Sequence, residues 1–449
     1  MPNLTNFKNF IQNANNSKGV KIDDNIVNKL IEMGKNARIA SQILRVLPRQ
    51  KKDDVLQNLV DILNKNKNII RDENKKDLDQ FEILRLNEIK EGKPNPKYTP
   101  ALKSRLDLFA DDEKYFKSMI SNITSVIKLD EVTGTSTNTK TLPSGITLKK
   151  QYVALGVMFM IYEARPNVTA DAAALCIKAG NACILKGGKE AIESNKAISK
   201  CIQQAFVQSG LGSLRNAVQV VDSVERWVTS AFLNMDSYID FVVPRGGKGL
   251  TSVVSRESKV PVIYHLDGTC HVYVDKYADL RKAVAIILNA KTQSYGTCNT
   301  MESLILHESI ADPLLKVLCP YLADADRKGQ EGGLNGKGIE IRAEYEIITH
   351  LKNVIKYPAE LMSVIKDKEE FSKEHLAPTM TLVIVNKMEE AIVHIETFGS
   401  HHTDAIITEN SFQANSFLNA VNSSSVFHNM STRFADGFEF GLGAEIGIS

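Results

Sequence analysis

The sequence predicts an α/β protein with two domains built on parallel sheets and a small β arm. From residue 152 onward, short apolar runs alternate with runs of helical periodicity. That alternation is typical of parallel strands covered by helices on both faces. The chain has 449 residues, more than one hydrophobic core usually holds, and a second α/β stretch spans about 268–420.

Residues 36–125 are predicted to be helical. Leu56, Leu59 and Leu63 recur at spacings of three and four residues, with Lys, Asp and Asn on the opposite face. Pro48 separates two of the predicted helices, because proline has no amide hydrogen to continue a helix.

Residues 126–152 predict a protruding β-hairpin. A Pro-Ser-Gly turn at 143–145 lies between short segments of alternating residues.

The next segment predicts the first parallel sheet. Helices are expected near residues 170–178 and 190–208, and strands near 153–161, 182–185, 217–221, 238–243 and 261–266. No Gly-x-Gly-x-x-Gly motif follows the first of these strands, so a conventional dinucleotide phosphate turn is not predicted.

Composition excludes several classes of protein. Lys and Arg number 55 against 53 for Asp and Glu, so the whole chain has no charge-driven attraction to nucleic acid or to a membrane surface. No apolar stretch approaches the roughly 18 residues of a membrane span, and the polar N-terminus lacks a signal-peptide core. Six cysteines without Cys-x-x-Cys spacing favour a reducing compartment and no metal site. A cytoplasmic protein is expected.

Cys298 is the candidate nucleophile. It lies in a polar, glycine-bearing segment, residues 289–299, directly after an apolar helical run. A tight turn at Gly296 can present a thiol to a cleft, and attack on a carbonyl carbon is chemistry that a thiolate performs. The alternative is a loop cysteine without a catalytic role.

Seven segments of the chain form a recognisable set in their order and spacing: residues 156–166 (GVMFMIYEARP), 167–178, 184–190, 243–247, 270–275, 289–299 and 431–437. Together they resemble the gamma-glutamyl phosphate reductase family of the aldehyde dehydrogenase superfamily. The resemblance implies an aldehyde dehydrogenase-like fold and NADPH-dependent reduction of L-glutamyl 5-phosphate to L-glutamate 5-semialdehyde through a thioacyl-cysteine. That reaction is the second step of proline biosynthesis.

The resemblance also implies a domain organisation and partners. Residues 1–127 and 151–263 would bind NADP, residues 264–420 would be catalytic, and residues 128–150 and 421–449 would form an oligomerisation arm. A homo-oligomer is expected, with glutamate 5-kinase as a second partner that supplies the acyl phosphate. The family usually continues past Ser449 with a further basic, glycine-containing segment that helps complete the arm, so reduced dimer stability or reduced activity is expected of this chain.

Three residues are assigned to catalysis by the resemblance. Cys298 matches the superfamily nucleophile, and Asn167 together with the Cys298 amide would hold the oxyanion. The alternative for Asn167 is a cap on the following helix. His265 lies where oxidative relatives carry the glutamate that activates water, so its presence agrees with reduction and not with hydrolysis. The alternative for His265 is a hydrogen-bonded histidine at the end of a strand.

Four residues after a buried strand are assigned to the cofactor: Lys186, Gly187, Gly188 and Lys189. NAD-preferring relatives often carry a glutamate where this chain has Lys189. A cation there would attract the 2′-phosphate of NADPH, which makes NADPH the expected cofactor. The alternative is a solvated lysine at the start of a helix.

The remaining candidates bind anions or ribose. Gly246 and Gly247 would open a helix toward a phosphate, and Glu374 matches the glutamate that holds the nicotinamide ribose. Arg165, Arg245 and Arg433 are the candidates for the phosphate and α-carboxylate of the substrate, because a guanidinium binds either anion. The alternative for Arg165 and Arg433 is a surface or interdomain ion pair.

Two other functions remain open on the sequence alone. One is an oxidative aldehyde dehydrogenase of the same fold, which His265 and Lys189 disfavour. The other is a non-catalytic nucleotide-binding relative.

Overall fold

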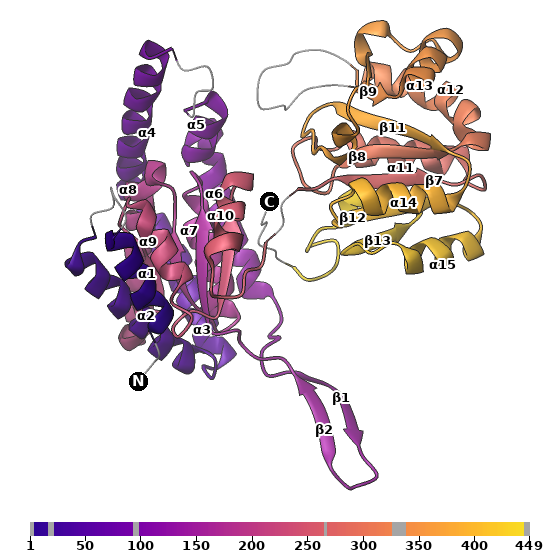
Figure 1. Cartoon of the computed structure of the whole chain (residues 1–449). Coiled ribbons are helices and arrows are strands. Elements are labelled where there is room, and N and C mark those ends of the chain that lie inside the picture. The colour runs from indigo at the N-terminus through magenta and orange to yellow at the C-terminus, as the bar shows by residue number, and fades with distance from the viewer. Residues whose placement is uncertain (1–3, 17–21, 93–97, 265–266, 326–337, 444–449) are drawn as a thin grey trace. The chain divides into compact units, whose positions relative to one another are not determined.

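The computed structural model describes residues 4–16, 22–92, 98–264, 267–325 and 338–443. These residues form two compact units, one that ends at Tyr264 and one that begins at Asp267. Figure 1 shows both units, with the colour following the residue number along the chain.

The first unit begins with helices, which cover much of the predicted helical range 36–125 and also extend before it. They are α1 (Thr5–Asn16), α2 (Asp24–Leu44), α3 (Arg49–Lys65), α4 (Lys67–Lys90), α5 (Pro100–Leu106) and α6 (Ala110–Lys128). Leu56, Leu59 and Leu63 are fully buried on α3, which confirms the amphipathic pattern. Pro48 is the N-cap of α3, so the predicted break between helices is also confirmed.

The hairpin predicted at the Pro-Ser-Gly turn is confirmed. Strands β1 (Ser136–Thr141) and β2 (Thr147–Gln151) pair in the antiparallel sense, with Thr141 opposite Thr147. Gly145 has a φ of 82°, a left-handed conformation that glycine adopts without strain. Every residue of the two strands is exposed, and the hairpin projects from the helices of its own unit (Figure 1).

A four-stranded parallel sheet forms the centre of the first unit. Its order is β5-β4-β3-β6, from β3 (Val157–Tyr162), β4 (Ala182–Lys186), β5 (Val218–Val220) and β6 (Phe241–Arg245). The connecting helices are α7 (Asn167–Lys178), η1 (Lys189–Ala191), α8 (Ile192–Gln208), η2 (Gly212–Leu214), α9 (Arg226–Leu233) and α10 (Lys248–Glu257). All six residues of β3 are buried, as expected of a strand covered on both faces.

The second unit contains a seven-stranded parallel sheet. Its strands, in the spatial order β10-β9-β11-β8-β7-β12-β13, are β10 (Met362–Val364), β9 (Glu340–Ala343), β11 (Thr379–Val385), β8 (Met301–His307), β7 (Cys270–Val274), β12 (Thr403–Ile407) and β13 (Ser425–His428). Its helical segments are α11 (Leu280–Thr292), α12 (Glu308–Asp324), α13 (Tyr345–His350), η3 (Leu351–Ile355), η4 (Ala359–Leu361), η5 (Lys368–Ser372), α14 (Met388–Phe398), α15 (Ser411–Ala420) and η6 (Thr432–Phe434).

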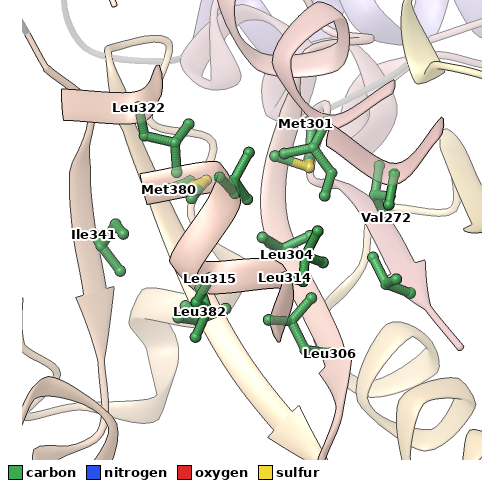
Figure 2. Close-up of a cluster of buried hydrophobic side chains, with 14 of the residues drawn as sticks. Val272, Met301, Leu304, Leu306, Leu314, Leu315, Leu322, Ile341, Met380 and Leu382 are labelled. Carbon is green, nitrogen blue, oxygen red and sulfur yellow. The ribbon is translucent and has the colours of Figure 1, made fainter. Parts of the chain in front are cut away.

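The core of the second unit lies between β-strand side chains and α12. Figure 2 shows Leu304 and Leu306 of β8 beside Leu314 and Leu315 of α12, and all four are fully buried. Truncating one such leucine to alanine typically costs about 2 to 5 kcal/mol, because a cavity remains. This packed centre holds β8 in place beside β7, and the loop of Cys298 leads directly into β8.

One part of the predicted arm has a different place. Residues 421–449 were expected in the arm, but Ser425–His428 pair in parallel with Thr403–Ile407 as the edge strand of the large sheet. This strand is short and carries polar residues at both ends, so it lacks the apolar run that marks the inner strands.

None of the helices in the described ranges is both long enough and apolar enough to cross a membrane.

Candidate active site

Cys298 lies in the loop that leads from α11 into β8. We call residues 293–300 the nucleophile loop. Cys298 is partly exposed, whereas the other five cysteines of the chain are buried and none of the six is in a disulfide. Partial access is what a reacting thiol requires. The predicted turn after the apolar helix is therefore confirmed, and the catalytic role of Cys298 stays a prediction.

The nucleophile loop is braced by its own threonines. The backbone N–H of Thr300 donates to the carbonyl of Thr297 at 2.9 Å, and the two hydroxyl oxygens are also 2.9 Å apart. The Thr300 hydroxyl donates to the carbonyl of Ser294 at 2.6 Å. These bonds close the loop into a compact turn around Cys298.

Arg433, from η6, binds the nucleophile loop on both sides of Cys298. Its Nη1 donates to the hydroxyl of Thr297 at 2.5 Å and to Oδ1 of Asn299. Asn299 in turn donates through Nδ2 to the carbonyl of Ala435 at 3.1 Å. Arg433 was predicted to bind a substrate anion. That role stays a prediction, and what the structure shows is that Arg433 brings a permanent positive charge to the loop that carries the thiol.

Gly268 lies directly against the backbone of Cys298. A Cβ at this position would clash with the Cys298 carbonyl oxygen and would lie 2.5 Å from its Cα and 2.6 Å from its carbonyl carbon. Ordinary carbon contacts begin near 3.5 Å, so a side chain does not fit. The sequence analysis missed Gly268. The one signal for it was a glycine two residues before β7.

Cys270 supports the same loop. Its thiol donates to the carbonyl oxygen of Cys298 at 3.1 Å. Burial raises the pKa of the Cys270 thiol well above its usual range, and the Asp404 carboxylate raises it further. Cys270 therefore remains a neutral thiol and a donor.

Two charged residues that the sequence analysis missed form a buried ion pair beneath the loop. Lys291 Nζ lies 2.8 Å from Glu302 Oε2, and the two side chains are 0% and 1% exposed. Burial lowers the pKa of Lys291 and raises the pKa of Glu302. A lysine near the end of a helix is normally solvated, so the sequence carried no signal for this pair.

Glu374 lies in an irregular segment ahead of β11, where it was predicted. We call residues 373–378 the Glu374 loop. The side chain of Glu374 is half-buried. Two residues later, the N–H of Leu376 donates to Glu302 Oε1 at 3.3 Å, so the loop is tied to the buried pair.

In the first unit, three predicted segments meet at one edge of the parallel sheet. Arg165 follows β3, Lys186 ends β4, and Arg245 ends β6. The strand β3 pairs with both β4 and β6, so their carboxyl ends are neighbours. Ligands of open α/β sheets bind outside the carboxyl ends of the strands, and this edge presents several cations to an anionic ligand.

The segment after β4 has the features expected of a cofactor turn. Lys186 is partly buried, and its Nζ donates to the carbonyl of Ser223 at 3.2 Å. Burial lowers the pKa of Lys186, while the Glu190 carboxylate opposes this shift. A Cβ on Gly187 would clash with Nδ2 of Asn195, so a larger residue there would displace the Asn195 side chain. Gly188 and Lys189 follow, and Lys189 is exposed.

The segment after β6 leaves a helix N-terminus open. Gly247 is the N-cap of α10, and a Cβ there would meet no atom within 4 Å. A Cβ on Gly246 would lie 2.9 Å from Leu250 Cδ2 and 3.0 Å from Glu163 Oε1. Phosphates bind readily at such helix starts. Glu163 is an acidic neighbour that the sequence analysis did not single out.

Asn167 begins α7, but it is not the cap of that helix. The N-cap is Pro166, and Asn167 Nδ2 donates to Asp171 Oδ2 at 3.0 Å. Burial raises the pKa of Asp171 to about 6, against hydrogen bonds from Asn122 and Asn167 that lower it. The capping alternative is therefore wrong, and the oxyanion role of Asn167 stays a prediction.

His265 lies outside the described residues.

Comparison with known proteins identifies the family. The aldehyde dehydrogenase family model matches residues 111–331. The gamma-glutamyl phosphate reductase of Thermotoga maritima is 32% identical, with a TM-score of 0.80 over 94% of this chain and 92% of that chain. The Saccharomyces cerevisiae enzyme of the same name is also 32% identical over 92% and 94% of the two chains, with a TM-score of 0.45.

A more distant structure shares the fold. An engineered glycolyl-CoA reductase with bound NADP⁺ is 16% identical, with a TM-score of 0.56 over 94% of this chain and 90% of that chain. The aldehyde dehydrogenase-like fold predicted from the sequence is confirmed. The chain therefore belongs to the aldehyde dehydrogenase family, in the branch of the gamma-glutamyl phosphate reductases, and is an oxidoreductase.

Proposed function

We propose that the protein reduces L-glutamyl 5-phosphate to L-glutamate 5-semialdehyde with NADPH, through a thioacyl intermediate on Cys298. The observation that carries this proposal is the partly exposed thiol of Cys298, held in a braced loop that Arg433 binds on both flanks. The near-complete match to the Thermotoga maritima reductase supports the same reaction.

The chemistry begins at the thiol. The Cys298 sulfur attacks the acyl carbon, a carbon–sulfur bond forms, and the carbon–oxygen bond to phosphate breaks. Phosphate is a good leaving group, so cations that bind its charge help this step more than a proton donor does. The backbone N–H of Cys298 and the side chain of Asn167 are our candidates for the donors to the oxyanion. The thioester carbonyl carbon would accept the hydride that a bound cofactor supplies, and the resulting thiohemiacetal on Cys298 would release the aldehyde and the thiol.

The first unit has residues that fit a dinucleotide cofactor. The open N-terminus of α10 at Gly247 suits a phosphate, and Lys186, Gly187 and Gly188 line the turn after β4. Glu374 would hold the nicotinamide ribose. NADPH, when bound, supplies the hydride.

Lys189 supports NADPH over NADH. Its exposed ammonium attracts a 2′-phosphate, which a carboxylate at the same place would repel. The NADP⁺ bound to the distantly related glycolyl-CoA reductase is compatible with this preference.

Three arginines are proposed to bind substrate anions. Arg433 donates to Thr297 and Asn299, the residues on either side of Cys298, so we assign it the charge near the reacting phosphate. Arg165 and Arg245, at the edge of the first sheet, would bind the remaining anionic groups. His265 replaces the water-activating glutamate of oxidative relatives, and the thioester is therefore reduced before it is hydrolysed.

We further propose a homo-oligomer in the cytoplasm. Leu142, Ile146 and Leu148 of the hairpin are 40%, 61% and 57% exposed, an apolar surface suited to a second copy. Six free cysteines suit a reducing compartment. Glutamate 5-kinase, which makes the unstable acyl phosphate, is the proposed second partner in proline biosynthesis.

The test is the reverse reaction. Purified protein is mixed with glutamate semialdehyde (as pyrroline carboxylate), phosphate and NADP⁺, and NADPH is followed by absorbance, with Cys298→Ala as the control. The expected result is NADPH formation that requires phosphate and vanishes in the variant. Formation without phosphate would instead indicate hydrolytic aldehyde oxidation, and binding of NADPH without turnover would indicate a non-catalytic relative.

A further inference from the structure

We propose that the buried ion pair between Lys291 and Glu302 is a positioning element that holds the nucleophile loop and the Glu374 loop in one fixed arrangement. The roles of Cys298 as nucleophile and Glu374 as ribose ligand are taken from the proposed function, on which this inference rests. Neither Lys291 nor Glu302 touches the reacting atoms; they act through the two loops.

The pair closes the base of the nucleophile loop. Lys291 is in the last turn of α11, directly before the loop, and Glu302 is the second residue of β8, directly after it. The 2.8 Å contact between their charged atoms therefore joins the two ends of the loop that carries Cys298. Because the loop is pinned at both ends, its turn cannot open without separating two buried charges.

Glu302 uses its second oxygen for the other loop. Oε2 binds Lys291, and Oε1 accepts the N–H of Leu376, two residues after Glu374. Leu376 has a φ of 50°, in the left-handed region that a leucine rarely adopts. Such conformations persist where the surroundings enforce them, and they gather at functional sites. The bond from Glu302 is one contact that enforces this one.

The surroundings of the pair connect it to the nucleophile a second time. Cys270 lies within electrostatic range of Lys291, and the Cys270 thiol donates to the carbonyl of Cys298. His375, the residue between Glu374 and Leu376, also faces Lys291. Burial and then the charge of Lys291 lower the pKa of His375 to about 4, so it stays neutral. One buried cluster thus contacts both loops.

A purely structural reason for the pair is weak. Replacing a buried ion pair by apolar residues of similar size is often neutral or stabilising, because both charges lose their hydration on folding. What an apolar pair cannot do is offer two directional acceptors to two different loops. We therefore infer that the pair serves to orient the nucleophile loop and the Glu374 loop.

Two double variants separate orientation from stability. Lys291→Met/Glu302→Met removes both charges and the acceptor for Leu376. Lys291→Gln/Glu302→Gln also removes both charges, but its amides can bond to each other and to the Leu376 N–H. Neither variant leaves a lone buried charge. Each is compared with the wild type in Tm, in the Kd for NADPH, and in the rate at which iodoacetamide alkylates Cys298.

The Met/Met variant is expected to keep a Tm within a few degrees of the wild type. We expect its Kd for NADPH to rise about tenfold and the rate of Cys298 alkylation to change at least about threefold. Both changes should be smaller than the roughly hundredfold loss of rate that a 1 Å misplacement can cause. The Gln/Gln variant should return both values toward the wild type. Wild-type Kd and alkylation rate in a folded Met/Met variant would overturn the proposal.

A surface variant covers the case in which Met/Met does not fold. The side chain of Leu376 is 45% exposed, so Leu376→Pro leaves the core intact while it removes the N–H that Glu302 accepts. A raised Kd for NADPH is expected in a variant that is still folded, and an unchanged Kd would refute the link to the Glu374 loop. Alkylation and binding need no turnover. Failure of the reverse assay would therefore count against the proposed function alone. The alkylation rate of Cys298 and the Kd for NADPH would still test the positioning role of the ion pair.

Discussion

Gly268→Ala is the sharpest test of how Cys298 is held. The added Cβ would lie 2.5 Å from the Cα of Cys298 and 2.6 Å from its carbonyl carbon. Carbon atoms pack at about 3.5 Å or more, so the two backbones must separate by about 1 Å. Both partners are backbone, so no side-chain rotation relieves the clash.

The size of the effect follows from that displacement. A misplacement of about 1 Å can lower kcat about a hundredfold when the geometry of attack depends on it. Overpacking of this kind also costs about 1 to 3 kcal/mol of stability, or a fall in Tm of about 2 to 12 °C for a unit of this size. The activity loss is expected to exceed what the stability loss explains at 25 °C, because the protein remains mostly folded.

The assay is phosphate-dependent NADPH formation, with Tm measured on the same samples. Gly212→Ala is the matched control, since its new Cβ would lie 3.7 Å from Val207 Cγ2, an ordinary contact far from the described site residues in sequence. Wild-type kcat and Tm in Gly268→Ala would refute the reasoning, because they would mean that the nucleophile loop is not pressed against Gly268.

Three further predictions follow from single residues. Lys189→Glu should lower the ratio of kcat/KM for NADPH to that for NADH by about tenfold or more, because like charges repel at the 2′-phosphate; an unchanged ratio would show that Lys189 does not face the cofactor. Cys270→Ala should reduce kcat less than about tenfold, since a thiol is a weak donor, whereas Cys298→Ala should abolish turnover in the same assay. Burial lowers the pKa of His394 to about 3, so the unfolded chain binds its proton first and stability falls as the pH drops below about 6.5. His394→Phe, among the aromatic neighbours Phe371 and Phe398, should therefore lose less Tm between pH 7 and pH 4.5 than the wild type does, and an equal loss would contradict this.

The sequence predicted what local patterns encode. Alternation of apolar and helical runs predicted both parallel sheets, and the turn before Gly145 predicted the hairpin. The segment around Cys298 predicted a turn with a partly accessible thiol after a helix. Each of these depends on neighbours in the chain, so a single sequence carries the signal.

The contacts that the sequence could not predict are those that form only when strands and helices pack together. Lys291 and Glu302 are eleven positions apart, and only the β7-α11-β8 connection brings them together in a buried site. The close approach of Gly268 to Cys298 likewise depends on the register of two strands. From its sequence, Lys291 is expected to be a solvated charge, because burial is not visible in a sequence. Leu376 is expected to be an ordinary loop residue, because a left-handed φ is not visible either.

The contacts of Arg433 also bear on how the protein matures. The residues that brace the nucleophile loop come from far along the chain, and the bond from Arg433 to Thr297 spans 136 positions. Long loops must close before such contacts form, and contacts of this kind tend to form late in folding. A chain still being synthesised has Cys298 long before it has Arg433. The thiol is therefore oriented only in the finished fold, and regain of activity on refolding should lag behind burial of the core.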